Sequence, residues 1–169
     1  MKCRKIPERG FSLIEILVVV AILGILANIA VPVLRKNMIR AQAIHVVSDF
    51  LKVRRAAFEY YRDHGKYPRD YYPGKEPPEL APYLKGRVKW RYPVRDVLYD
   101  WENWVRRNGK PKHRWTRVLY GFSITTRNHE LVDAIKKVYD GPFHYTLGAN
   151  YTFVIDPVPP SSRKPGRRW

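Results

Sequence analysis

Residues 11–34 read FSLIEILVVVAILGILANIAVPVL, and this apolar stretch decides how the chain begins to fold. About 20 apolar residues in an α-helix are enough to cross the roughly 30 Å hydrocarbon core of a membrane. The run of 24 residues is interrupted only at Ser12, Glu15, Gly24, Asn28 and Pro32. The sequence therefore predicts one membrane-spanning helix, which Pro32 should kink because proline lacks a backbone donor and clashes with the preceding turn.

One carboxylate, Glu15, lies inside this apolar stretch. An acidic side chain in the middle of a membrane span costs about 2.5–3.5 kcal/mol on insertion scales, so such residues usually have a partner. The basic leader MKCRKIPERG precedes the stretch and ends at Gly10. A cut after Gly10 would give Phe11 a positively charged α-amino group, with which Glu15 of a neighbouring subunit can pair.

This N-terminus resembles that of the type IV prepilins and the pseudopilins of type II secretion. The resemblance rests on the basic leader, Gly10, Phe11, the acid Glu15 at the fifth position after the cut, and Pro32 near the end of the apolar run. It implies that a prepilin peptidase cleaves after Gly10 and methylates Phe11. It also implies a structural role rather than an enzyme: a single-pass protein of the bacterial inner membrane that an assembly platform adds to a helical filament of like subunits.

Three common kinds of N-terminal segment fit these residues less well. A secretory signal is cleaved after its apolar core, at an A-x-A-like site, whereas a cut after Ala30 would place Asn28 at the third-last position. A plain signal anchor leaves Glu15 and the Gly10-Phe11 junction to chance, and in a lipoprotein the cysteine would follow the core. Basic residues flank the stretch on both sides, so the positive-inside rule does not set the orientation. The resemblance implies a cytoplasmic leader and a periplasmic head, with the filament in the periplasm or outside the cell.

The helix is expected to continue beyond the membrane over residues 35–64. Apolar side chains recur there every three or four residues, as in an amphipathic helix. They are Ala43, Val47, Phe50, Val53, Ala57 and Tyr61. The opposite face is basic, and His64 followed by Gly65 predicts the end of the helix, because glycine readily takes the left-handed cap conformation. Residues 11–64 then form one helix of 54 residues, about 80 Å long at 1.5 Å per residue.

The remaining sequence predicts a small β-rich head over residues 65–156. A short helical turn is expected at residues 78–84, strands at 96–101, 115–124 and 150–156, and a helix at 129–139. The fold class expected is α+β, pilin-like, with the long helix covering one face of an antiparallel sheet. The chain thus divides into a leader (1–10), a membrane or filament-core helix (11–34), its amphipathic continuation (35–64), the head (65–156) and a basic, proline-rich tail (157–169).

Cysteine and histidine usage narrows the chemistry of the head. Cys3 is the sole cysteine of the chain, so no disulfide can form in the mature head. Many pilins of retractile pili have one, and its absence favours a type II secretion pseudopilin over a type IV pilus subunit. No metal-ligand spacing or nucleophile motif is present, and no cofactor is expected. Calcium at Asp96, Asp100 and Glu102 is the metal alternative, because pseudopilin heads bind calcium; surface acids in a turn are the simpler interpretation.

The basic character of the chain raises a second functional class, capture of DNA for uptake by a minor pilin. The formal net charge is +17, and cations that alternate with aromatic residues can hold single strands through phosphate contacts and base stacking. The candidate residues are Lys89, Trp90, Arg91, Arg106, Arg107, Lys112, Arg114 and Arg117. A basic protein binds DNA weakly whatever its role, and the aromatic residues are also needed to fill a small core.

Overall fold

A computed structural model describes residues 10–92, 96–106, 108–112, 118–145 and 149–157 of the chain. The chain divides into two compact units, Met1–Ile39 and Arg40–Trp169. Helix α1, Leu13–His64, runs from the first unit into the second. It ends where expected, and Gly65 takes the left-handed conformation, with φ of 68°. In the first unit the apolar side chains of α1 are exposed, whereas the second unit has a hydrophobic core.

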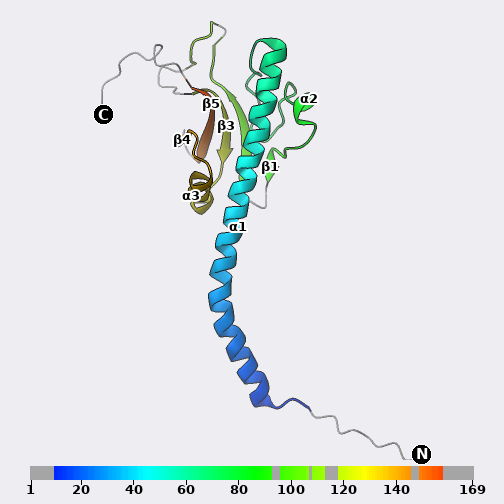
Figure 1. Ribbon diagram of the computed structural model, residues 1–169, viewed down its shortest axis with the longest axis vertical. Coiled ribbons are helices and arrows are strands. Elements are labelled where there is room, and N and C mark those ends of the chain that lie inside the picture. The colour runs from blue at the N-terminus through cyan, green and yellow to red at the C-terminus, as the bar shows by residue number, and fades with distance from the viewer. Residues whose placement is uncertain (1–9, 93–95, 107, 113–117, 146–148, 158–169) are drawn as a thin grey trace, which may run out of the picture. The chain divides into compact units, whose positions relative to one another are not determined.

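The second unit contains a five-stranded antiparallel sheet in the order β1-β2-β3-β5-β4 (Figure 1). The strands are β1, Arg91–Tyr92; β2, Val97–Asn103; β3, Val118–Thr125; β4, Phe143–Tyr145; and β5, Asn150–Pro157. Helix α2, Ala81–Leu84, precedes the sheet, and α3, His129–Val138, connects β3 to β4. The side chain of Asn128 caps α3 by accepting a hydrogen bond from the backbone N–H of Leu131 at 3.1 Å. The expected α+β class is confirmed.

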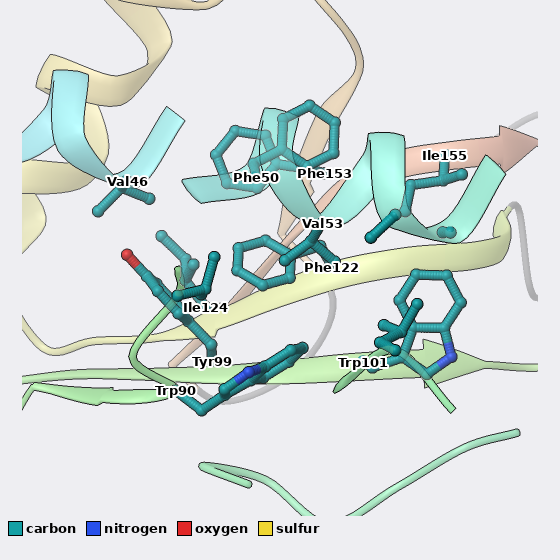
Figure 2. Close-up of a cluster of buried hydrophobic side chains, with 14 of the residues drawn as sticks. Val46, Phe50, Val53, Trp90, Tyr99, Trp101, Phe122, Ile124, Phe153 and Ile155 are labelled. Carbon is teal, nitrogen blue, oxygen red and sulfur yellow. The ribbon is translucent and has the colours of Figure 1, made fainter. Parts of the chain in front are cut away.

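One face of this sheet packs on the part of α1 that belongs to the second unit (Figure 1). Phe50 of α1 stacks on Phe153 of β5, with the ring centroids 4.5 Å apart, and also contacts Phe122 of β3. Figure 2 shows these rings between α1 and the strands, together with Tyr99 and Trp101 of β2. Aromatic side chains thus supply a large share of the core volume that a small domain needs.

The buried carboxylate of Asp49 joins α1 to the first two strands. Its side chain is 1% exposed. Its Oδ2 accepts hydrogen bonds from the hydroxyls of Tyr92 and Tyr99, each at 3.2 Å, and lies 3.1 Å from Nδ1 of His45. Its Oδ1 accepts from Nζ of Lys52 at 2.8 Å. A buried carboxylate is tolerated only with such partners, so Asp49 links the helix to β1 and β2.

The structure corrects several details of the sequence prediction. Strands β1 and β4 are absent from that prediction, because two or three residues carry too little alternation to be recognised. On α1, Tyr61 is 47% exposed and Val47 only partly buried, whereas Tyr60 and Val46 enter the core. Residues 115–117 of the predicted strand 115–124 and most of the tail, 158–169, lie outside the described residues.

Candidate functional site

The first turn of α1 holds Glu15 through a reciprocal pair of hydrogen bonds with Ser12. The backbone N–H of Ser12 donates to Oε2 of Glu15 at 2.8 Å, and the backbone N–H of Glu15 donates to Oγ of Ser12 at 3.3 Å. This arrangement is a capping box, which satisfies two backbone donors that a helix start otherwise leaves free. A carboxylate in the first turn also interacts favourably with the helix dipole. Glu15 therefore has a structural role within its own chain.

Gly10 and Phe11 precede this turn, and both are exposed. A Cβ atom placed on Gly10 would meet nothing within 4 Å, so the fold itself does not require glycine there. Phe11 is 83% exposed and precedes the helix, which begins at Leu13 rather than at Phe11 because Ser12 caps it. Any requirement for a small residue at position 10 must come from another molecule that binds the chain at Gly10 and Phe11.

The apolar N-terminal part of α1 is long enough to cross a membrane. Among the described residues, α1 is the one helix that meets this criterion of length and composition. None of its most apolar 18-residue stretch is buried within the structure. Large exposed apolar side chains include Val20, Ile25 and Ile29, which are 61%, 64% and 65% exposed. Pro32 lies inside this helix, which continues past it to His64. An apolar surface of this extent fits membrane anchoring or burial against other subunits.

The three candidate calcium ligands do not converge on one point. Asp96 precedes β2 with φ of 49°, and its carboxylate accepts from the backbone N–H of Arg127 at 3.0 Å. Asp100 lies four residues further along the strand, about 13 Å away at 3.3 Å per residue. Among the described residues, no group of three or more His, Cys, Asp or Glu side chains could hold a metal ion. The described structure therefore gives no support to calcium at these acids, and the calcium alternative stays a prediction.

Asp100 and Glu102 instead lie on the face of β2 opposite the core, because side chains alternate along a strand. Oδ1 of Asp100 is buried and accepts no hydrogen bond in the described part of the chain. Burial, followed by the charges of Glu102 and Asp70, raises the pKa of Asp100 to about 8. Burial also raises the pKa of Glu102, which a hydrogen bond from Ser123 opposes. With a pKa of about 8, Asp100 is mostly protonated, and therefore uncharged, in the folded chain at neutral pH.

The candidate nucleic-acid residues are divided by the fold. Trp90 is 5% exposed, and its ring packs edge-on against Phe122, so it is not available to stack on a base. This part of the sequence prediction is corrected: Trp90 is a core residue. Its neighbours Lys89 and Arg91 are exposed.

The remaining candidates lie on the segment between β2 and β3. Lys112 forms a salt bridge with Asp70 at 2.8 Å, and Arg106 donates to the backbone carbonyl of Lys112 through Nε and Nη2 at 3.3 and 2.8 Å. Arg107, Arg114 and Arg117 lie outside the described residues. In the described structure these cations stabilise a local turn, in which the backbone N–H of Lys112 also donates to the carbonyl of Trp104 at 2.6 Å.

Two residues with clear roles escape sequence reasoning. Ser12 is recognisable as the start of the capping-box pattern S-x-x-E over residues 12–15, which indicates a partner for Glu15 inside its own chain. Asp49 has no such signal. It interrupts the apolar face of α1, and its partners Tyr92 and Tyr99 are more than 40 residues away in sequence.

Comparisons with known proteins match part of the chain. Residues 7–30 match the family described as the prokaryotic N-terminal methylation motif. The type II secretion system core protein G of Klebsiella michiganensis is 43% identical over 65 residues, which are 38% of this chain and 46% of that protein. The type IV major pilin protein PilE1 of Neisseria gonorrhoeae is 40% identical over 63 residues, 37% of this chain and 38% of the pilin.

The matched segment thus spans less than half the length of these curated relatives. No solved structure matches the chain significantly. The relatives are structural pilin and pseudopilin subunits, not enzymes. With Gly10, Phe11 and the capped Glu15 all inside residues 7–30, the chain carries the prokaryotic N-terminal methylation motif, and its homologues are type II secretion protein G and the type IV pilins.

Proposed function

We propose that this chain is a structural subunit of a type IV filament-like assembly, cleaved after Gly10 by a prepilin peptidase. One observation carries the proposal: Gly10, Phe11 and Glu15 stand at the start of a long, exposed apolar helix, within the matched methylation motif. Residues 1–10 are then the leader on the cytoplasmic side of the inner membrane. Residues 11–34 anchor the subunit before assembly, residues 35–64 continue the helix, residues 65–156 form a periplasmic head, and residues 157–169 form the tail.

The capping box supports a specific role for Glu15 in assembly. Ser12 occupies Oε2 of Glu15, which leaves Oε1 without a partner among the described contacts. That oxygen can accept the α-amine that cleavage creates on Phe11 of a neighbouring subunit. The capping box fixes the direction of the carboxylate before the neighbour arrives, so less side-chain entropy is lost when the ion pair forms.

Within this class we propose a pseudopilus of type II secretion. Two features support it: no cysteine follows Cys3, and the similar proteins include core protein G of that system. The similar proteins also include type IV major pilins, so a type IV pilus is the competing assembly. Deleting the chromosomal gene separates them, because loss of a secreted enzyme with unchanged surface pili supports the pseudopilus, and loss of pili with normal secretion contradicts it.

Two substitutions test the proposed processing and assembly. Gly10→Leu should stop cleavage, seen as a full-length chain by mass spectrometry; a mature-sized product would remove the peptidase assignment. Glu15→Ala should leave insertion and cleavage intact but reduce filament formation by at least about tenfold, since an ion pair in a dry environment is lost. Ser12→Ala is the matched control, because it removes the side-chain oxygen that caps the backbone N–H of Glu15 and retains the carboxylate. Equal loss in both variants would mean that Glu15 acts only through helix capping.

A DNA-binding minor pilin remains the second candidate function, supported by the net charge of +17 and by the exposed Lys89 and Arg91. The test is titration of the intact chain in detergent with single-stranded and duplex DNA at several salt concentrations. Binding that persists near physiological salt and falls with Lys89→Gln supports capture. Binding that disappears there reflects only general charge.

A further inference from the structure

Helix α1 presents an apolar stripe on the side that faces away from the sheet. Ile44, Leu51 and Phe58 are 53%, 49% and 41% exposed, and they recur every seven residues. Seven residues make about two turns of an α-helix, so the three side chains lie in one row. The core-facing row, which includes Phe50 and Val53, is fully buried. Folding of the head therefore does not require the three side chains of the apolar stripe to be apolar.

A basic groove runs beside the apolar stripe, between α1 and the chain around α2. It has a volume of about 470 Å³. Lys52 and Arg55 line it from α1, and Lys85 and Arg87 line it from the segment after α2. Ala56 and Leu84 form an apolar floor. Arg55 lines both this groove and the shallower depression around Leu51 and Phe58, so groove and stripe form one continuous surface.

The positive charge of this surface is only partly neutralised by the chain itself. Arg55 pairs with Glu59 at 2.9 Å, and Lys52 pairs with the buried Asp49 at 2.8 Å. Within the described ranges, Lys85, Arg87 and Arg54 make no ion pair, and Arg54 lies over the ring of Phe58 at 5.4 Å. Exposed cations next to exposed apolar side chains attract a ligand that offers both carboxylates and an apolar row.

We propose that the basic groove and the apolar stripe bind an acidic amphipathic helix of a partner protein that is not a second copy of this chain. The apolar row of the partner would pack along Leu51 and Phe58, as in helix-in-groove recognition, and its flanking carboxylates would reach Arg87 and Lys85. This inference rests on the proposed function and deepens it by stating the chemistry of the neighbouring subunit.

Charge argues against a second copy as the occupant. Each copy carries a formal net charge of +17, which falls to +14 once residues 1–10 are removed, so two copies repel one another unless an acidic surface intervenes. Three exposed acids in the described head already pair with cations of their own chain, Asp63 with Arg62, Asp70 with Lys112 and Asp133 with Lys136. These ion pairs reduce the negative charge that a second copy could offer to the groove.

The exposed apolar row argues against nucleic acid. Phosphate contacts need cations alone, and single strands bind through flat aromatic platforms on which bases stack. The stripe instead exposes the aliphatic side chains of Ile44 and Leu51, and the face of its one aromatic ring, Phe58, is covered by Arg54. An apolar row of this kind is matched by a protein helix.

The test uses the full-length chain in detergent micelles and a labelled helical peptide of about three heptads, with leucine on one face and glutamate beside it. A peptide with glutamine in place of glutamate is the matched probe. By fluorescence anisotropy near physiological salt, the glutamate peptide should bind at least about tenfold more tightly than the glutamine peptide. Arg87→Gln and Leu51→Ser should each weaken binding about tenfold or more.

Lys137→Gln and Tyr72→Ser are the controls, because they remove an exposed cation and an exposed apolar side chain elsewhere on the head. Both should bind like the wild type. Weakening by Arg87→Gln but not by Leu51→Ser would overturn the proposal, since charge alone would then suffice. Displacement of the peptide by equimolar DNA would also overturn it in favour of nucleic acid.

A photo-cross-linker at position 51 in living cells identifies the natural occupant. A cross-linked peptide from another chain with an acidic amphipathic sequence supports the proposal, and a peptide from this same chain overturns it in favour of self-association. Peptide binding does not depend on cleavage after Gly10 or on filament formation. It can therefore fail while the Gly10 and Glu15 variants behave as proposed, and it can succeed while those variants do not.

Discussion

Replacing Asp100 by asparagine should stabilise the head at alkaline pH. Asp100 lies on the outer face of β2, its Oδ1 is buried without a hydrogen bond in the described structure, and Glu102 and Asp70 add negative charge nearby. Burial and these charges raise its pKa from the usual 3.8 to about 8. Asparagine has nearly the same shape and cannot ionise, so the substitution removes the charge while retaining the packing.

The size of the effect follows from proton linkage. The folded chain binds the Asp100 proton more tightly than the unfolded chain, so the free energy of unfolding falls as pH rises from about 4 to about 8 and levels off above that. A difference of roughly four between the folded and unfolded pKa corresponds to at most about 5.5 kcal/mol. Because the side chain is only half-buried, solvent screening reduces the expected gain of the asparagine variant to about 1–3 kcal/mol at high pH.

The measurement is urea unfolding of the intact chain in detergent, followed by tryptophan fluorescence, since Trp101 is fully buried next to Asp100. Near pH 9 the variant should be more stable by the amount given, and near pH 3, below the usual pKa of 3.8, where Asp100 is protonated in both the folded and the unfolded chain, the two should agree within about 0.5 kcal/mol. Asp133→Asn, an exposed carboxylate on α3, is the control. An equal gain at both pH values, or none at either, would refute the reasoning.

Three further predictions concern stability. Asp49→Ala leaves the hydroxyls of Tyr92 and Tyr99 without their acceptor and should cost about 2–4 kcal/mol in chemical unfolding; a cost below about 0.5 kcal/mol would contradict the linking role of Asp49. Phe50→Ala removes a fully buried ring that stacks on Phe153 and should cost about 3–5 kcal/mol, with Phe58→Ala on the exposed face as the milder control. Asn128→Ala removes the cap of α3 and should cost about 1 kcal/mol, with hydrogen exchange accelerated first in the initial turn of that helix.

The elements with a strong local pattern could be predicted from the sequence. The end of α1 at His64, the helix α3 and the strands β2 and β5 agree with the prediction within two residues, because each has a clear hydrophobic period or a stop signal. The two shortest strands, β1 and β4, depend on pairing with β2 and β5, and such long-range contacts leave no local trace.

The candidate site residues divide in the same way. The motif at Gly10, Phe11 and Glu15 is contiguous, so it can be read directly. The alternation of cations and aromatics around Trp90 misled the interpretation, because in the segment that leads into β1 every second side chain, Val88 and Trp90, enters the core. The groove at Arg87 joins residues about 30 positions apart, and only the fold brings them together.

The hydrogen bonds of Asp49 also determine which residues of α1 remain in contact with solvent. A turn of the helix about its axis by one residue, about 100°, would remove the carboxylate from Tyr92 and Tyr99 together. The tyrosines therefore select one rotational setting of α1 against the sheet, where apolar side chains alone would accept several with similar area buried. In that setting Ile44, Leu51 and Phe58 point outward. The buried hydrogen bonds of Asp49 thus determine which side chains of α1 form the exposed apolar stripe.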